Sequence, residues 1–313
     1  MKKCDEGKEM SMPSQDLFMD KISVDRIRGH ILALEGPRHP VAAPEALESA
    51  ADYIADYLRC LNYEMSEHCF NESGREFRNV IATLPGMTHP EKRVVVLAHF
   101  DTIANTPGAD DNASGVALLL ELAEILKPFQ FEQTIHLIGV NLEENQKEGD
   151  HESGTRGSLA LAKHAHELGW EIEGVVVLES VAYASDSVLQ TFPAGVPVPV
   201  PKMANFIAVV GNEKSHDLVQ GFVRAVEKYR IDLPHFAMTV PGNGEALPDS
   251  RRSDHAPFWD HGYKAVMITD TTNFRNPHYH GPSDTLETLD LDFAVNVCRA
   301  TRGLLVEMAR LIA

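Results

Sequence analysis

The sequence predicts an α/β fold of three layers, in which helices cover both faces of a mixed, mostly parallel central sheet. Two observations carry this prediction: strand-like apolar runs alternate with segments of helical periodicity, and the chain of 313 residues is long enough to bury a large core. Strands that alternate with helices pair mainly in parallel and are covered on both faces. We expect a single domain over residues 26–313, preceded by a loose tail or short extra helix over residues 1–25.

The apolar pattern places the elements in order. A first helix is predicted over residues 43–61, because apolar residues recur there at helical spacing. Strands are predicted over residues 79–84, 93–99, 134–142, 174–178, 206–210 and 265–269. Helices are predicted over residues 113–126, 158–168, 215–229 and 291–312. The proline-rich stretch 193–201 fits neither a helix nor a central strand, so we expect a surface loop within the domain.

The chain is acidic, with a formal net charge of -18 at pH 7. Because a protein that binds phosphate groups needs a basic surface, this charge argues against a nucleic-acid partner. No apolar run approaches the length of a membrane span, so no membrane partner is expected. The first residues lack the apolar segment of a signal peptide. We therefore expect a cytoplasmic protein, with a trimmed secreted form as the alternative.

The four cysteines are scattered along the chain and form no C-x-x-C pair. Zinc held by thiolates is therefore not expected. Cys60 and Cys69 could in principle pair, but reduced thiols are the favoured interpretation.

Ionisable residues gather where the predicted strands end, which is where active sites of open α/β sheets lie. Buried carboxylates that crowd together repel one another unless a cation binds them. Two imidazoles and three carboxylates would suit two zinc ions, and a further carboxylate would then be free as a general base. The candidates are His99, Asp101, Asp110, Asp111, Glu143, Glu144, Glu179, His278 and His280.

Each candidate also has a structural interpretation. An H-x-D pair is usually structural, an E-E pair usually lies on a solvated face, and D-D-N beside glycine is usually a turn. Glu179 taken alone would suit a salt bridge. The metal site is favoured because all of these residues fall at predicted strand ends.

Six motifs follow one another in fixed order: H-F-D (99–101), G-A-D-D-N-A-S-G (108–115), E-E (143–144), G-S-L-A-L-A (157–162), S-D-H (253–255) and H-x-x-x-D-T (280–285). Together they resemble peptidase family M28, the co-catalytic zinc peptidases that include bacterial aminopeptidases, glutamate carboxypeptidases and the related glutaminyl cyclases. The G-A-D-D-N-A-S-G segment is the most specific of the motifs. The resemblance runs from about Asn79 to the C-terminus and implies the zinc exopeptidase fold with two zinc ions per chain.

The resemblance implies a metal-binding role for five residues of this chain. Asp111 would bridge the two zinc ions. His99 and Glu179 would complete one zinc site, and Glu144 and His280 would complete the other.

The resemblance also implies two roles in the chemistry. Glu143 would take a proton from the bridging water and pass it to the leaving amine. Asp101 would hold the far nitrogen of His99, which orients a ligand imidazole. The family also places a cis peptide bond after the bridging aspartate, here between Asp111 and Asn112.

Four neighbouring residues keep alternative roles. Asp254 is either the N-terminal cap of a helix or a partner of the metal ligands. His255 either lines the pocket or packs in the core, and His278 is not matched as a ligand. Asp284 is expected to orient the loop that carries His280.

The chain departs from the family at two points. Glu179 stands where the well-studied aminopeptidases of the family carry aspartate, and the tyrosine that stabilises the oxyanion in some members is absent before S-D-H. Arg251, Arg252 or Arg275 would then supply positive charge for the tetrahedral intermediate or for a substrate carboxylate, although at least two of them are expected to be surface arginines.

We therefore predict a zinc-dependent exopeptidase, in the first place an aminopeptidase acting on peptides. The alternatives are a carboxypeptidase or dipeptidase on the same fold, a glutaminyl cyclase that needs one zinc ion, and a receptor-like member without metal. The last alternative is disfavoured because no expected ligand is missing from this sequence.

Overall fold

We describe the protein from a computed structural model, which covers residues 21–145, 153–193, 195–196 and 199–312. Residues 1–20 of the predicted tail lie outside the described residues. Helix α2 (Val24–Leu34) begins two residues before the predicted start of the domain, with Ser23 as its N-cap. The Ser23 side chain accepts a hydrogen bond from the backbone N–H of Arg26, which stabilises the helix start.

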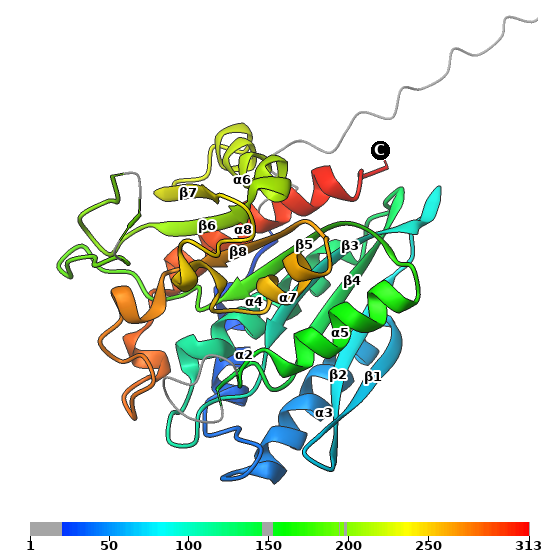
Figure 1. Cartoon of the computed structure of the whole chain (residues 1–313), viewed down its shortest axis with the longest axis horizontal. Coiled ribbons are helices and arrows are strands. Elements are labelled where there is room, and N and C mark those ends of the chain that lie inside the picture. The colour runs from blue at the N-terminus through cyan, green and yellow to red at the C-terminus, as the bar shows by residue number, and fades with distance from the viewer. Residues whose placement is uncertain (1–20, 146–152, 194, 197–198, 313) are drawn as a thin grey trace, which may run out of the picture.

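Within the described residues, eight strands form one mixed sheet in the order β1-β2-β4-β3-β5-β8-β6-β7 (Figure 1). The central strands β4, β3, β5 and β8 run parallel, whereas β2 and β6 are antiparallel to the central strands beside them. This confirms the predicted mixed α/β sheet. The strands are β1 (Glu64–Glu72), β2 (Arg75–Leu84), β3 (His89–His99), β4 (Gln133–Val140), β5 (Glu171–Glu179), β6 (Ile207–Asn212), β7 (His235–Val240) and β8 (Ala265–Thr269).

Helices cover both faces of the sheet, as predicted (Figure 1). Helices α2, α3, α4, α6 and α8 share one hydrophobic core with one face, and α5 and α7 pack on the other. Among the described residues, no helix combines the length and apolarity needed to cross a membrane. The remaining helices are α3 (Pro44–Cys60), α4 (Gly115–Leu126), α5 (Arg156–Glu167), α6 (His216–Lys228), α7 (His255–Asp260) and α8 (Leu291–Met308).

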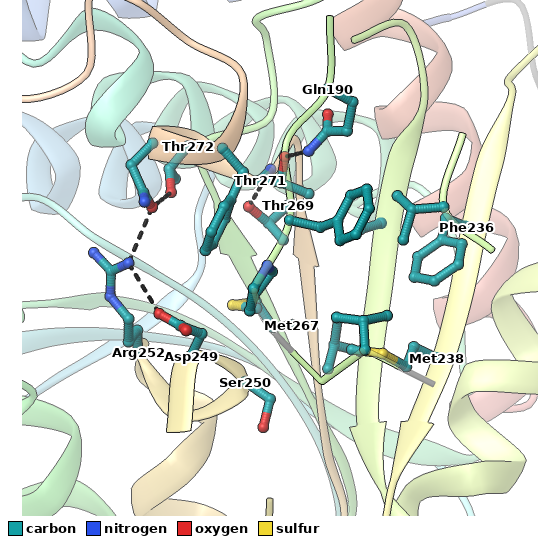
Figure 2. A pocket seen from close by; sticks show the side chains of 18 of the residues that line it. Gln190, Phe236, Met238, Asp249, Ser250, Arg252, Met267, Thr269, Thr271 and Thr272 are labelled. Atoms are coloured by element: carbon teal, nitrogen blue, oxygen red, sulfur yellow. Dashed lines mark hydrogen bonds and ion pairs between the residues drawn. The ribbon is translucent and has the colours of Figure 1, made fainter. Parts of the chain in front are cut away.

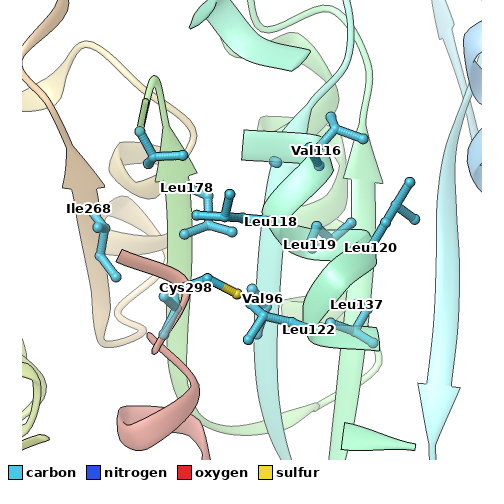
Figure 3. Close-up of a cluster of buried hydrophobic side chains, with 14 of the residues drawn as sticks. Val96, Val116, Leu118, Leu119, Leu120, Leu122, Leu137, Leu178, Ile268 and Cys298 are labelled. Carbon is cyan, nitrogen blue, oxygen red and sulfur yellow. The ribbon is translucent and has the colours of Figure 1, made fainter. Parts of the chain in front are cut away.

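Helix α4 lies in the middle of the larger core (Figure 3). Its sequence, GVALLLELAEIL, is apolar on almost every side, as expected of a helix that is buried all round. Leu118 and Leu122 pack among sheet residues that include Val96 and Leu178. Because closely packed interiors resist deformation, this core holds the ends of β3 and β5 in fixed positions.

Three elements were not predicted from the sequence: helix α2 and the edge strands β1 and β7. β1 is largely exposed and polar, and β7 is half-buried, so neither has the apolar run of a central strand. The closing helix ends at Met308 and not at residue 312, because Arg310 takes a left-handed φ of 57° and Leu311 pairs with Phe131. In the described part of 193–201 there is no helix or strand, and Cys60, Cys69 and Cys298 are free thiols.

Candidate metal centre

Two groups of three side chains meet at the carboxyl ends of the central strands. One consists of His99, Asp111 and Glu179, and the other of Asp111, Glu144 and His280; in each group one ligand atom per residue lies within 4.8 Å of the others. Asp111 belongs to both groups. Its Oδ1 lies 3.2 Å from Nε2 of His99, and its Oδ2 lies 3.3 Å from Nε2 of His280. One carboxylate oxygen of Asp111 therefore faces the group of His99 and Glu179, and the other faces the group of Glu144 and His280.

The donor atoms of this cluster fit divalent cations. Nε2 of His99, Nε2 of His280, Oδ1 of Asp111 and Oε1 of Glu144 are buried and form no hydrogen bond. Buried polar atoms without a partner are rare in native proteins and call for an explanation such as an ion. Imidazole nitrogen and carboxylate oxygen are also ligands that zinc prefers.

The electrostatics of the cluster call for positive charge. Burial lowers the pKa of His99, but the negative charge of Glu179 and the adjacent carboxylates of Asp101 and Asp111 outweigh burial and raise this pKa well above its usual range. Burial and the charge of Asp111 raise the pKa of Glu144 to about 7. The potential at the centre is therefore strongly negative, and bound cations would neutralise it.

Three residues at or beside the centre have left-handed backbone conformations, which residues other than glycine rarely adopt. Leu142, which precedes Glu143, has a φ of 58°, and Ser180, which follows Glu179, has a φ of 45°. His280 itself has a φ of 56°. Left-handed backbone at residues other than glycine costs about 1–3 kcal/mol and clusters at functional sites. These backbone conformations direct the side chains of Glu143, Glu179 and His280 towards the centre.

Asn112 connects the loop of Asp111 to the end of β5. The peptide bond between Asp111 and Asn112 is cis, as the family resemblance predicts. Oδ1 of Asn112 accepts hydrogen bonds from the backbone N–H of Ser180 and of Gly115. A Cβ on Gly115 would lie 2.3 Å from this oxygen, so glycine is required for the close approach of α4 to the loop.

Asp110 and Asp284 hold the same loop from the other side. Asp110 accepts hydrogen bonds from the backbone N–H of Ala182 and from the amide of Asn276. Asp284 was expected to orient the loop of His280, and instead its carboxylate accepts from the backbone N–H groups of Asp110 and Asp111. It therefore ties the two loops together.

Asp101 serves both His99 and the E-E turn. Its carboxylate oxygens accept hydrogen bonds from the backbone N–H of Glu143 (2.9 Å) and of Glu144 (3.1 Å). Nδ1 of His99 lies 3.2 Å from the main-chain oxygen of Asp101 and 3.5 Å from its carboxylate. The far nitrogen of His99 thus points at Asp101, and the same residue orients the Glu143–Glu144 turn.

Glu143 and Asp254 are two further carboxyl groups beside the ligands. Burial raises the pKa of Glu143 well above its usual range against the opposing effect of His99, and the charges of Glu179 and Glu144 add to the rise. Burial also raises the pKa of Asp254 to about 7, and neither of its carboxylate oxygens accepts a hydrogen bond. The capping interpretation of Asp254 is therefore wrong, since its side chain caps no backbone N–H of α7.

Known proteins resemble this chain in sequence and in fold. The sequence model of peptidase family M28 matches residues 79–305. The chain belongs to peptidase family M28. This confirms the resemblance that the motifs predicted.

Two relatives extend the M28 assignment. The uncharacterized protein YfbL of Escherichia coli is 30% identical over 269 residues, which are 80% of this chain and 78% of the relative. Leucine aminopeptidase 1 of Uncinocarpus reesii is 28% identical over 248 residues, which are 77% of this chain. The match covers only 56% of that aminopeptidase, so the chain spans just over half the length of this relative.

A solved structure shows how widely the M28 fold is used. Glutaminyl cyclase of Macrostomum lignano superposes with a TM-score of 0.76 at 20% identity, covering 99% of this chain and 96% of the cyclase. At this identity the likeness concerns the fold alone. The reaction of this M28 member must therefore be argued from its own site.

An apolar cavity opens beside the metal centre of this M28 chain. Glu179 and Tyr279 line its inner end, and strands β6, β7 and β8 form its wall. Figure 2 shows Phe236, Met238 and Met267 facing this space, with the Arg252–Asp249 ion pair at one side. Such a cavity suits an uncharged side chain of a ligand bound at the centre.

The three arginines considered as sources of positive charge differ in position. Arg251 is ion-paired with Asp260, and the buried Arg275 donates to the main-chain oxygen of Phe206. Arg252 lines the apolar cavity and donates to the hydroxyl of Tyr279 at 3.4 Å. Of the three, Arg252, which is also ion-paired with Asp249, is therefore the arginine that lies beside Tyr279.

Tyr279 was missed by sequence reasoning. Its ring stacks on His280 with centroids 3.8 Å apart. Burial and the charges of Asp111 and Glu144 raise the pKa of Tyr279 well above its usual range, so the hydroxyl keeps its proton and can donate a hydrogen bond. Its position immediately before His280 was the available signal.

Two histidines lie outside the two ligand groups. Nε2 of His255 lies 2.7 Å from the main-chain oxygen of Ser250, and the ring packs edge-on against Trp259, which is a core role. Nδ1 of His278 lies 2.9 Å from Oγ of Ser283. Neither belongs to the groups around Asp111.

Proposed function

We propose that this chain is a zinc-dependent aminopeptidase that holds two zinc ions and releases apolar residues from the N-terminus of peptides. The observation that carries the proposal is the pair of ligand groups that share Asp111, with Glu143 beside them. His99, Asp111 and Glu179 would hold one ion, and Asp111, Glu144 and His280 would hold the other. Zinc bound there would activate water and polarise the carbonyl of the scissile bond.

Residues of the chain would then have separate roles in the reaction. Glu143, whose pKa is raised by burial, accepts a proton from the attacking water and returns it to the leaving amine. The hydroxyl of Tyr279, held by Arg252, donates a hydrogen bond to the oxyanion that develops on the carbonyl. Asp101 keeps the Glu143 turn and His99 in position.

The charge around the centre supports binding of a free N-terminus. Asp254 lies beside the centre but outside both ligand groups, and bound cations would favour its ionised form, which attracts an ammonium group and repels a carboxylate group. The apolar cavity beside Glu179 would take the side chain of the first residue. The similarity to a leucine aminopeptidase agrees with this orientation.

Glutaminyl cyclisation is the second candidate, because glutaminyl cyclase of Macrostomum lignano shares this fold. That chemistry needs one zinc ion and a pocket for an N-terminal glutamine. Two complete ligand groups and an apolar cavity argue for hydrolysis.

The test measures metal content and substrate range together. Zinc is removed with a chelator and restored, and hydrolysis of Leu-, Ala-, Glu- and Arg-p-nitroanilide is compared with that of N-blocked dipeptides. We expect two zinc ions per chain, recovery of activity with zinc, and a preference for Leu-p-nitroanilide. Cleavage of blocked dipeptides alone would instead indicate a carboxypeptidase. Release of ammonia from glutaminyl peptides with one zinc ion per chain would indicate a cyclase.

A further inference from the structure

A second cavity opens onto the metal centre from the opposite flank. Asp101 and Glu144 form its inner end, whereas the apolar cavity reaches the centre at Glu179 and Tyr279. Its outer wall comes from the hairpin of β1 and β2, and the apolar cavity is built on β6, β7 and β8. These strands lie at opposite ends of the sheet order, on either side of β3 and β5. A peptide bound at the centre can therefore extend into both cavities.

Two arginines line the second cavity together with the carboxylates of Glu72, Asp101 and Glu144. Nη2 of Arg156 donates to the main-chain oxygen of Glu144 at 2.9 Å, and its Nε is buried without a hydrogen-bond partner. Nη1 of Arg75 donates to the main-chain oxygen of Pro40 at 2.6 Å, and its guanidinium lies 5.2 Å from the ring centroid of Phe77. Across the part of the chain that the structure describes, neither arginine forms an ion pair.

The other polar groups of this cavity leave the arginines available. Glu72 lies opposite Arg75 in the β1–β2 register, and its carboxylate accepts a hydrogen bond from Oγ of Ser73. Nδ1 of His39 accepts from the backbone N–H of Val41 and Ala42, so its Nε2 carries the ring proton and can donate. Guanidinium groups bind carboxylates in a bidentate manner, with stronger hydrogen bonds than neutral donors make.

We propose that Arg156 and Arg75 bind the C-terminal carboxylate of a short peptide, so that di- and tripeptides are the preferred substrates. This inference rests on the proposed aminopeptidase function, in which the leaving portion extends away from the apolar cavity. Arg156 contacts the main chain of Glu144 at the centre, and a residue spans at most about 3.6 Å of chain, so the carboxylate of a short leaving portion can reach the arginines. Longer peptides would place a neutral amide where the arginines lie.

The test compares acids with matched amides. The kcat and KM are measured with zinc-loaded protein for Leu-Gly and Leu-Gly-Gly and for the C-terminal amide of each. We expect kcat/KM to be about ten- to a hundredfold higher for each acid than for its amide, mainly through KM. Leu-Glu amide and Leu-Gln amide form a second pair, which detects binding of an acidic side chain in place of the terminal carboxylate.

Variants assign the preference to the arginines. Arg156→Gln and Arg75→Gln should each bring the ratio of acid to amide towards one, and Arg156→Lys should keep part of the preference. Arg224→Gln, on the exposed side of α6, is the matched control and should keep the wild-type ratio. Zinc content is measured for each variant, because Arg156 contacts the backbone of Glu144.

Four outcomes would overturn the proposal. Equal kcat/KM for acid and amide in the wild type, or an unchanged ratio in both glutamine variants, would exclude carboxylate binding while leaving the aminopeptidase function intact. A preference for Leu-Glu amide without one for Leu-Gly would reassign the cavity to an acidic side chain. If zinc-loaded protein hydrolyses none of these peptides or p-nitroanilides, the aminopeptidase function itself fails.

Discussion

Strand β5 passes through two opposite environments within a few residues. From Val175 to Leu178 its side chains are fully buried among apolar neighbours. The next residue, Glu179, is also buried, but it lies among imidazoles and carboxylates. β3 repeats this contrast, because Val96 packs in the larger core and His99 ends the strand at the metal centre.

The contrast shows how the protein can stay folded although its candidate metal centre lowers stability. Burying crowded carboxylates and left-handed backbone lowers stability, and burying apolar surface raises it. The helix-covered middle of the sheet therefore stabilises a fold whose strand ends are unfavourable without cations. If the two regions have separate tasks, substitutions in them should separate activity from stability.

The largest effect is expected at Glu143. Glu143→Gln keeps the side-chain shape but cannot accept a proton, so kcat should fall about 10²- to 10⁴-fold. Zinc content should stay near the wild-type value, and the free energy of unfolding should not fall, because a neutral side chain replaces a buried carboxyl group whose pKa is raised. Glu171→Gln on an exposed part of β5 is the control. Near-normal turnover of Glu143→Gln would show that another group is the base.

A substitution in the hydrophobic core should lower stability and leave kcat almost unchanged. Leu118→Ala removes a fully buried side chain of α4 and should lower the free energy of unfolding by about 2–5 kcal/mol. The kcat of the folded fraction should change little. Chemical denaturation with parallel activity measurements tests this, with Leu168→Ala at an exposed position as the control. A large loss of kcat in folded Leu118→Ala would mean that the two regions are not separable.

Acid should destabilise the protein through buried histidines. Burial lowers the pKa of His255 to about 4, below the ordinary value of 6.5. The unfolded chain therefore takes up the proton first, so the stability from this group is complete above pH 6.5 and is lost as the pH falls from 6.5 towards 4. At pH 5 the loss is about 2 kcal/mol.

Denaturation of wild type and His255→Gln at pH 7.5 and pH 5 measures this contribution. The variant should lose about 2 kcal/mol less than the wild type between the two pH values. Equal losses in both proteins would show that His255 is protonated in the folded state as readily as in the unfolded state.

The smallest effect should be a gain of stability at the site. The folded pKa of Asp254 is about 7, above its ordinary value of 3.8, so its charge disfavours folding increasingly as the pH rises from 3.8 through 7. In metal-free protein at pH 5, Asp254→Asn should raise the free energy of unfolding by about 1–2 kcal/mol. The gain should grow as the pH rises from 5 towards 7. Asp232→Asn, at an exposed position, should show no such gain.

Much of the fold could be predicted because its signals are local. Apolar runs such as residues 93–99 mark strands that are buried on both faces, and helical spacing marks residues 43–61. The edge strands β1 and β7 were missed because an edge strand needs no continuous apolar run. The ends of elements, such as that of α8, depend on contacts with distant residues.

The candidate site divides in the same way. His99, Asp111, Glu144, Glu179 and His280 could be named from the sequence, because each stands in a short motif at a strand end. Tyr279 beside Arg252, the unpaired Asp254 and the role of Asp284 could not, since each depends on which loops meet in space.

The sequence by itself determined the fold class, the membership of peptidase family M28 and the residues that can bind metal. Apolar periodicity and short motifs involve residues that are close in the sequence, so they can be recognised without a structure. The tertiary structure alone decided that two cavities flank the centre. Met238 and Met267, like Arg75 and Arg156, come from distant segments, and the order of the strands in the sheet brings each pair together.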